Sequence, residues 1–194
     1  MDTYENIRSR RSIRHFKTDP IPQDVIERIM DAATWAPSAM NRQRWKFYVL
    51  TEELRYRLAS IHNPLFEQME PALRERYGDE GVEKRRDLYT DFAGAPVAVV
   101  CFTEYTKETY KPDLISASLA CENLVLAANA EGLGSLMMTS SLALSDEISF
   151  LCGVDQKKME PVMVILLGYA DEKPEAPERR KNRVVYASER SHIK

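Results

Sequence analysis

The sequence predicts a single α+β domain that spans residues 1–194. Two apolar runs of strand length, residues 97–102 and 162–167, indicate strands that are buried on both faces. Residues 113–130 are apolar on nearly all sides, which is typical of a central helix. Helices and strands at these spacings favour an α+β layer structure, with a mixed α/β sheet as the alternative. A chain of this length buries roughly 70% of its unfolded surface, which is enough for one core.

The N-terminal part of the chain carries signals for two helices and a strand. Residues 2–9 predict a short helix. Pro22 suits the first position of the second helix because its fixed φ matches a helical turn, and Pro37 lies beyond that helix's end. Residues 46–50 alternate and include aromatic and β-branched side chains, which predicts a strand. The predicted buried stripe of the second helix consists of Val25, Ile26, Ile29, Met30 and Ala33.

The middle of the chain, residues 52–88, is strongly charged and predicts helix. We expect a break at Asn63-Pro64, because proline removes a helical hydrogen bond and restricts the residue before it. A second break is expected near Gly78, because glycine weakens a helix and admits conformations that other residues avoid.

The C-terminal half adds shorter elements around the two apolar segments. Gly132 follows the central helix, at a position where a left-handed residue is favoured. Residues 146–151 predict another short helix. The tail is rich in Pro, Lys, Arg and Glu, and only residues 184–186 within it suggest a strand.

The charge balance favours small-molecule partners over nucleic acid or a membrane. The formal net charge is -3 and the isoelectric point is about 5.7, whereas a general nucleic-acid binder is usually basic. The apolar helix at 113–130 is interrupted by Glu122 and Asn123 and is too short to span a bilayer comfortably. We therefore expect neither a nucleic-acid nor a membrane partner.

The cysteines and histidines indicate neither a disulfide framework nor a metal site. The three cysteines are widely spaced, form no CxxC pair, and favour reduced thiols. The three histidines are scattered, so no metal is expected. The N-terminus lacks a basic flank followed by an apolar stretch, as a secretory signal requires, and a cytoplasmic location is expected.

A cluster of arginines follows the first predicted helix. Arg10, Arg11 and Arg14 place three positive charges around the hydroxyl of Ser12, a combination that suits phosphate. Two unit charges 4 Å apart attract by about 4 kcal/mol at an effective dielectric constant of 20. The three arginines cannot share one face of a continuous helix, so convergence requires a break near Ser12. Taken alone, such a cluster is more often a solvated charged face.

Three further segments carry polar or glycine-rich patterns. Residues 36–45 form a turn rich in hydroxyl and amide groups, which either binds a planar polar ligand or only ends a helix. Residues 132–139 lack the third glycine of a dinucleotide fingerprint, and their simpler interpretation is a helix end followed by a buried strand. The basic run at 179–183 is of a kind that is usually solvated. No serine, cysteine or histidine lies in a recognisable nucleophile motif.

Together, and in this order, the four segments resemble the nitroreductase family of FMN-dependent oxidoreductases. The resemblance extends over nearly the whole chain. It implies an α+β fold with a central mixed or antiparallel sheet flanked by helices. It also implies an intertwined homodimer that holds two FMN molecules at the subunit interface. The apolar helix at 113–130 would then be buried between subunits.

The resemblance also implies which residues contact FMN. The residues that match those holding the phosphate, the ribityl chain and the pyrimidine edge are Arg10, Arg11, Ser12 and Arg14. The segment that the partner subunit lends to the isoalloxazine ring matches Pro37, Ser38, Ala39 and Asn41. The stretch beside the flavin matches Met137, Met138 and Thr139. Arg180 matches a further phosphate-contacting arginine.

The implied activity is hydride transfer from NADH or NADPH, through FMN, to nitroaromatic, quinone or free-flavin acceptors. No side chain is assigned as a catalytic acid. The alternatives are a specialised member of the family, namely a dehalogenase, a dehydrogenase or a flavin-fragmenting enzyme. A protein that binds a flavin or a nucleotide without turnover is the alternative from outside the enzymes.

Several features bear on the acceptor. By resemblance, residues 63–92 cover the substrate pocket, and Tyr105 and Tyr110 add to that cover. Arg44 stands where the family usually has proline and adds a charge beside the expected site. Met137 stands where many relatives have an aromatic residue.

Overall fold

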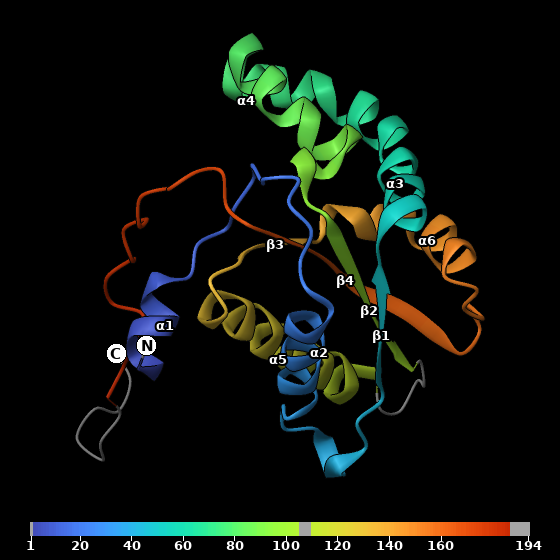
Figure 1. The fold of residues 1–194 in the computed structure, drawn as a ribbon, viewed down its shortest axis with the longest axis vertical. Coiled ribbons are helices and arrows are strands. Elements are labelled where there is room, and N and C mark those ends of the chain that lie inside the picture. The colour runs from blue at the N-terminus through green and yellow to red at the C-terminus, as the bar shows by residue number, and fades with distance from the viewer. Residues whose placement is uncertain (1, 105–109, 187–194) are drawn as a thin grey trace, which may run out of the picture.

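The computed structural model describes residues 2–104 and 110–186, which form six α-helices and one four-stranded sheet (Figure 1). The helices are α1 (Thr3–Ser9), α2 (Gln23–Thr34), α3 (Glu52–Ile61), α4 (Asn63–Thr90), α5 (Tyr110–Ala130) and α6 (Ser145–Leu151). The strands are β1 (Trp45–Leu50), β2 (Val97–Glu104), β3 (Gly134–Met138) and β4 (Met159–Gly168). Short 3-10 turns lie at η1 (Ala39–Asn41), η2 (Phe92–Gly94) and η3 (Ser140–Leu144).

The strands are ordered β1-β2-β4-β3, and every neighbouring pair is antiparallel. Val99 of the central strand β2 lies opposite Val49 on one side and Ile165 on the other. The two wholly apolar runs of the sequence are therefore the two central strands, as expected for strands buried on both faces. The α+β expectation is confirmed, and the mixed α/β alternative is wrong because no pair of these strands is parallel.

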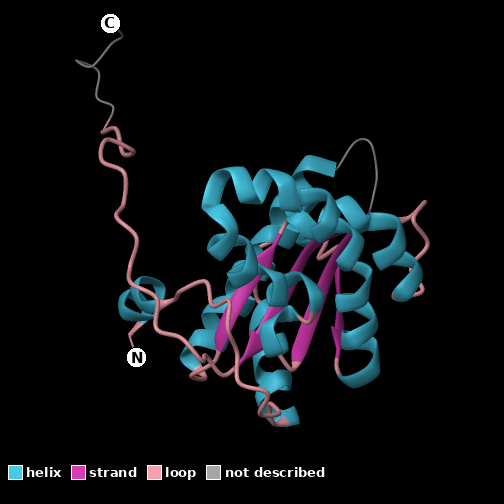
Figure 2. Cartoon of the chain, turned by 90° about the horizontal axis from the view of Figure 1, so that it is seen from above, coloured by secondary structure: helices cyan, strands magenta, loops and turns pink. Residues whose placement is uncertain are grey.

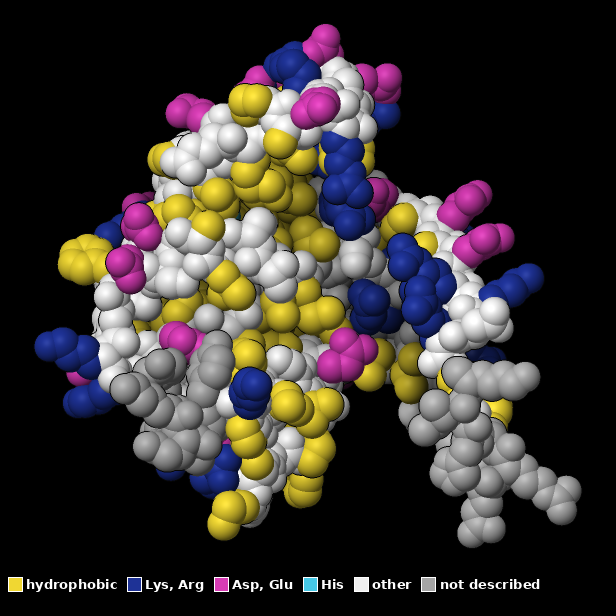
Figure 3. All heavy atoms as spheres, turned by 180° about the vertical axis from the view of Figure 1, so that it is seen from behind, with side chains coloured by type: hydrophobic (Ala, Val, Ile, Leu, Met, Phe, Trp, Pro, Cys, Tyr) yellow, Lys and Arg dark blue, Asp and Glu magenta, His cyan; other side chains and the backbone are white. Residues whose placement is uncertain are grey.

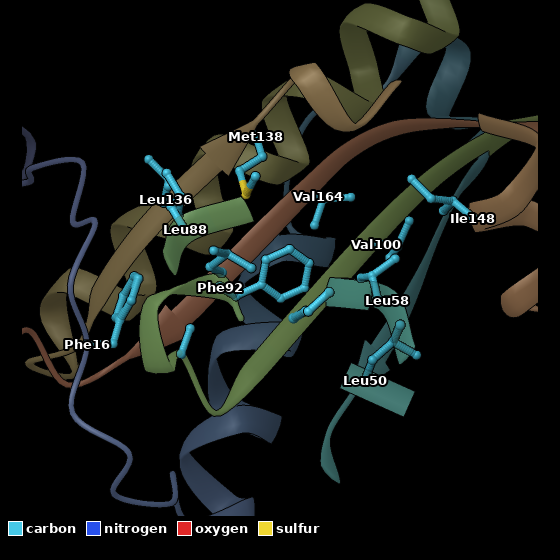
Figure 4. Close-up of a cluster of buried hydrophobic side chains, with 14 of the residues drawn as sticks. Phe16, Leu50, Leu58, Leu88, Phe92, Val100, Leu136, Met138, Ile148 and Val164 are labelled. Atoms are coloured by element: carbon cyan, nitrogen blue, oxygen red, sulfur yellow. The ribbon is translucent and has the colours of Figure 1, made fainter. Parts of the chain in front are cut away.

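Helices cover both faces of the sheet, so the molecule has two apolar cores (Figure 2). Helices α2 and α5 pack on each other and on one face, against Val99, Cys101 and Ile165. On the other face, α3, α6 and the end of α4 surround Phe92, which Figure 4 shows beside Val100. Successive residues of β2 thus alternate between the two cores, as the pleat of a strand requires.

The segment that follows α1 lies in extended form beside the sheet. Ile13 donates its backbone N–H to the carbonyl of Ser135 in β3 at 3.0 Å. The Phe16 N–H donates to the Ala93 carbonyl at 3.0 Å, and both Ile13 and Phe16 are buried. Because the helix ends at Ser9, the break that the arginine cluster requires is present. The backbone of residues 12–16 is therefore held to the edge of the sheet.

The predicted breaks in the charged middle region are confirmed. Asn63-Pro64 begins α4 directly after α3, with the proline in the first turn where it is tolerated. Gly78 divides α4 into two helical limbs, at φ 69° and ψ 178°, a backbone region that is essentially restricted to glycine. Gly132 has φ 80° after α5, as its position after the helix predicted.

The expected strand at 184–186 is wrong for the described chain. Val184, Val185 and Tyr186 form no strand, and Tyr186 is 91% exposed. A β-favouring segment forms a strand only when a sheet edge pairs with it, and the chain after β4 runs past α1 and away from the sheet (Figures 1 and 2). Tyr105 lies outside the described residues, and only the backbone of Tyr110 is described. Of the helices that are described, none has the length and apolarity needed to cross a membrane.

The contact between Ile13 and Gly134 gives the first prediction. A Cβ added at Gly134 would lie 2.8 Å from Cγ1 and 3.1 Å from Cβ of Ile13, so the G134A substitution should push residues 12–14 off β3. We expect the free energy of unfolding to fall by about 1–3 kcal/mol, the usual effect of overpacking a core contact. Chemical denaturation measures this change. The I13A/G134A double variant should lose less unfolding free energy than the I13A and G134A variants lose in sum. Strictly additive losses would contradict the contact between the two residues.

Candidate functional site

A cavity of about 360 Å³ lies where the arginine segment meets the C-terminal tail. In an extended segment, successive side chains alternate, so Ile13 enters the core while Ser12 and Arg14 face away from it. Four arginines and one glutamate line the cavity, which makes its lining strongly positive. The lining residues are Arg10, Arg11, Ser12, Arg14, Pro174, Glu175, Pro177 and Arg179.

Local hydrogen bonds fix the backbone and one of the arginines. The Glu172 carboxylate accepts the backbone N–H of Arg14, which joins the tail to the arginine segment. The Arg11 guanidinium donates to the carbonyls of Arg8 at 2.6 Å and Arg10 at 2.9 Å. Arg11 therefore caps the C-terminal end of α1, where carbonyl groups lack helical partners. Its side-chain hydrogen bonds are to backbone carbonyls of neighbouring residues.

The basic tail contributes one arginine to the lining of this cavity. Arg179 lines the cavity, whereas the neighbouring Arg180 is exposed and is not part of its lining. Sequence reasoning missed Arg179, although the basic run at 179–183 contained the signal. Figure 3 shows Lys and Arg side chains gathered between α4 and the terminal segments, next to an apolar hollow.

The second predicted segment forms a strained turn around η1. Met40, Asn41 and Gln43 have φ values of 54°, 53° and 48°, which residues with a side chain rarely adopt. The Ser38 hydroxyl accepts the backbone N–H of Gln43 at 3.1 Å, and the Gln43 amide donates to Asn41 Oδ1 at 2.8 Å. Strained backbone of this kind clusters at ligand sites and persists only when its surroundings hold it.

Within a single chain, this turn does not reach the arginine cavity. The turn precedes β1, and the arginine segment docks on β3, so the two lie at opposite edges of the sheet (Figure 1). None of Pro37, Ser38, Ala39 and Asn41 lines the cavity that the arginines line. Instead, Asn41 contributes to another cavity of about 360 Å³, which is also lined by Asp31, Thr34, Trp35, Ala36 and Gln43.

The third predicted segment is the end of β3. Met138 is buried in the core around Phe92, and Met137 is half-buried against the opposite core. Thr139 is exposed. The simpler interpretation of this segment, a buried strand after a helix end, is thus what the structure shows, and Thr139 is the member that solvent reaches.

Arg44 does not leave an unbalanced charge beside the turn. Its guanidinium lies 3.2 Å from Glu104 and 3.7 Å from Asp113. Arg42 donates to Asp113 Oδ1 from Nε at 3.1 Å and from a terminal nitrogen at 2.7 Å. Two arginines thus face two carboxylates. Sequence reasoning did not single out Asp113, and its only signal was an acidic residue near the start of an apolar helix.

A buried histidine links α3 to η3, directly after β3. His62 Nδ1 lies 2.8 Å from the Leu58 carbonyl, and Nε2 lies 2.8 Å from the Ser141 hydroxyl. A carbonyl only accepts, so Nδ1 carries the proton and Nε2 accepts from Ser141. Burial lowers the pKa of His62, because the charged imidazolium is poorly solvated there. Across residues 2–104 and 110–186, no group of three His, Cys, Asp or Glu is placed to hold a metal ion.

Comparison with known proteins decides the family. The nitroreductase family matches residues 7–169. The chain belongs to the nitroreductase family. A 4-nitrobenzoate reductase of Pseudomonas putida is 29% identical over 194 aligned positions, which cover 86% of this chain and 84% of the relative. An iodotyrosine deiodinase of Hydra vulgaris is 26% identical, with 93% of this chain and 69% of that protein covered.

The nitroreductase fold is confirmed by solved structures. The crystal structure of the FMN-dependent nitroreductase NfnB from Mycobacterium smegmatis, in complex with NADPH, matches with a TM-score of 0.79. The two sequences are 20% identical, and the match covers 95% of this nitroreductase-family chain and 97% of NfnB. The family and the fold that the four segments suggested are both confirmed.

The burial of His62 predicts that the stability of the protein depends on pH. Since the pKa of His62 is lower in the folded protein, the unfolded chain binds more protons below the ordinary histidine pKa of about 6.5. Stability should therefore be complete above that pH and fall as the pH decreases, by at most about 1.4 kcal/mol per pH unit for one group. Urea denaturation between about pH 7 and pH 5 measures this loss.

The matched variants are His62→Gln and, for an exposed histidine, His15→Gln. The H62Q protein should lose less stability between the two pH values than the wild type does. An equal loss in the wild type and in H62Q would contradict the assignment.

Proposed function

We propose that this nitroreductase-family chain is an FMN-dependent oxidoreductase that transfers hydride from NADH or NADPH to a small-molecule acceptor. The acceptor class is nitroaromatic or quinone. The observation that supports this most directly is the arginine-lined cavity, whose arginine segment is hydrogen-bonded to the edge of the sheet. The nicotinamide loses a hydride, and the acceptor gains two electrons and takes up protons.

The arginine cavity fits the phosphate of FMN. A phosphate monoester carries close to two negative charges near neutral pH, and guanidinium groups match its oxygens in charge and geometry. Arg10, Ser12 and Arg14 would bind the phosphate, the ribityl chain and the pyrimidine edge. Arg11 and Arg180 remain predicted contacts, as do Met137, Met138 and Thr139. FMN, when bound, supplies the two-electron chemistry, and the protein supplies position and electrostatics.

The second half of the site comes from another copy of the chain. The turn with Pro37, Ser38, Ala39 and Asn41 lies at the opposite sheet edge from the arginine cavity, so a second subunit would have to deliver it. An intertwined homodimer meets this requirement, with one site at each of two symmetry-related junctions.

Exposed apolar side chains support the homodimer. Helix α5 is apolar on nearly all sides, yet Ile115 is 60% exposed and Leu119, one turn further, is 42% exposed. Trp35 and Met40 are also exposed, after α2 and in the turn. Helix α2 packs along α5, so these residues lie on neighbouring elements. Large exposed apolar groups of this kind mark protein interfaces.

A reductive dehalogenase is the second candidate, because an iodotyrosine deiodinase is among the relatives. The charged helix α4 projects beyond the sheet over the apolar hollow and would shape the acceptor pocket in either case (Figures 1 and 3).

The described cysteines are free thiols, which suits the reducing cytoplasm.

The visible absorption spectrum of the purified protein tests the proposal first. Bound FMN, identified after release, supports the site, and a colourless protein that takes up no added FMN would contradict it. The holoprotein is then mixed with NADH or NADPH, with and without a quinone, a nitroaromatic or an iodinated phenol. Oxidation that depends on one acceptor identifies an enzyme and its class, whereas bound flavin without turnover would indicate a binding protein.

Removal of the Arg10 and Arg14 side chains should release FMN. We expect the R10A/R14A variant to bind FMN at least about a hundredfold more weakly, since each lost charge-assisted contact contributes about 1.5–3 kcal/mol. Its circular dichroism spectrum should be unchanged, because the docking of residues 12–16 uses backbone groups. The control is K157A/K158A, which removes the same charge from an exposed turn. Stoichiometric FMN in R10A/R14A would contradict the phosphate assignment.

Mixed dimers test whether the turn acts across the interface. The S38A variant should bind FMN weakly, because it loses both a ligand contact and the hydrogen bond from Gln43. A heterodimer of one R10A/R14A chain and one S38A chain then retains one complete site only if each site uses two chains. We expect half the wild-type FMN content in such heterodimers, isolated by two affinity tags. Heterodimers without FMN would show that each site lies within one chain.

A further inference from the structure

Asp113 is a deeply buried carboxylate at the start of α5. It lies in the first turn of the helix and is 2% exposed. Charged side chains are rarely buried so completely unless they are paired. The pairing here is with Arg42, at 2.7 Å and 3.1 Å to Oδ1, and with Arg44, at 3.7 Å to Oδ2. Both partners belong to one short segment of the chain.

That segment overlaps the end of the strained turn. Arg42 is the residue after η1, and Arg44 precedes β1. One helical turn after Asp113, the Ser116 hydroxyl accepts the backbone N–H of Ala39 at 3.1 Å. The first turns of α5 therefore hold the segment at its beginning, through Ala39, and at its end, through the two arginines.

The turn requires such an external hold. Three of its residues, Met40, Asn41 and Gln43, have left-handed backbone conformations without being glycine. The hydrogen bonds from Gln43 to Ser38 and Asn41 lie within the turn, so they shape it but do not attach it to the body of the protein. Asp113 and Ser116 supply that attachment, and a strained conformation persists only when its surroundings determine it.

We propose that Asp113 is a positioning residue for FMN, which acts by fixing the turn at residues 38–43 through Arg42. The inference rests on the proposed function, because it assumes that this turn contacts the flavin ring. Ser38 and Asn41 present their polar atoms to the ring in one geometry only while the arginine beyond them is anchored. Loss of the anchor lets the turn relax toward unstrained conformations, and the polar atoms lose their alignment.

The positioning of the turn depends on the negative charge of the Asp113 carboxylate. Arg42 and Arg44 are both largely buried, at 19% and 27% exposed, and the two positive charges face Asp113 and Glu104. Asparagine at position 113 keeps the shape and one acceptor oxygen but removes the charge. Arg42 would then lose its carboxylate partner while Arg44 keeps Glu104, and a largely buried charge without its partner is destabilising.

The experiment measures the FMN dissociation constant of the apoprotein by flavin fluorescence. We expect D113N to bind FMN about tenfold more weakly than the wild type, equivalent to about 1.4 kcal/mol. The matched control is E131Q, which removes one negative charge just beyond the other end of α5, where Glu131 pairs with the exposed Arg28. E131Q should bind FMN as the wild type does.

A double-mutant cycle separates positioning from a general loss of stability. If Asp113 acts through the turn, then D113N should weaken FMN binding less than about twofold in an S38A background, where the turn's contact is already lost. A general destabilisation would weaken binding by the same factor in both backgrounds. If D113N does not fold, R42Q removes the same link from the other side and should give the same tenfold loss and the same non-additivity.

The outcomes for the inference and for the proposed function are distinguishable. If the wild type binds FMN and D113N or R42Q binds it equally well, the positioning role is wrong and the proposed function stands. If D113N weakens FMN binding by the same factor in the wild-type and S38A backgrounds, the role of Asp113 is structural only and the inference is overturned. If the wild type binds no FMN, the proposed function fails, and the inference fails with it.

Discussion

The docking of residues 12–16 on the edge of β3 is the constraint on which the candidate site depends. Helix α1 is only seven residues long and buries no side chain within the described chain, so it cannot by itself position the arginines that follow. Position comes instead from Ile13, which packs on Gly134 and bonds to Ser135, and from Phe16, which is anchored beside Gly94 and Gly168. Long arginine side chains bind an anion specifically only when the backbone that carries them is fixed.

The order of the strands separates the polar segments of the site. With the order β1-β2-β4-β3, the turn before β1 and the arginine segment beside β3 lie on opposite edges. The exposed apolar side chains of α5 support a second copy of the chain as the link between these two regions. A dimer of this kind would make flavin binding and subunit association depend on each other.

Buried charge in this protein stabilises junctions between elements. Arg55, which is 4% exposed, donates to the Ala95 carbonyl at 2.7 Å and to the Asp91 side chain at 2.5 Å, and so ties α3 to the turn before β2. Asp113 ties α5 to the turn before β1 in the same manner. Arg55 satisfies a backbone carbonyl of the irregular segment before β2, whereas Asp113 pairs with arginine side chains of the segment before β1.

The sequence by itself determined the elements, because their signals are local. Apolar periodicity marked α2 and α5, the wholly apolar runs marked β2 and β4, and Gly78 and Gly132 marked the breaks, each within a few residues of the observed bounds. The arginine cluster was also visible in the sequence. Only the tertiary structure decided that the sheet is antiparallel, that Arg179 rather than Arg180 lines the cavity, and that residues 184–186 form no strand. It also decided that Arg44 is paired with Glu104 and Asp113. These features depend on which distant segments meet, and strand pairing, cavity walls and ion pairs have no signature in the local sequence.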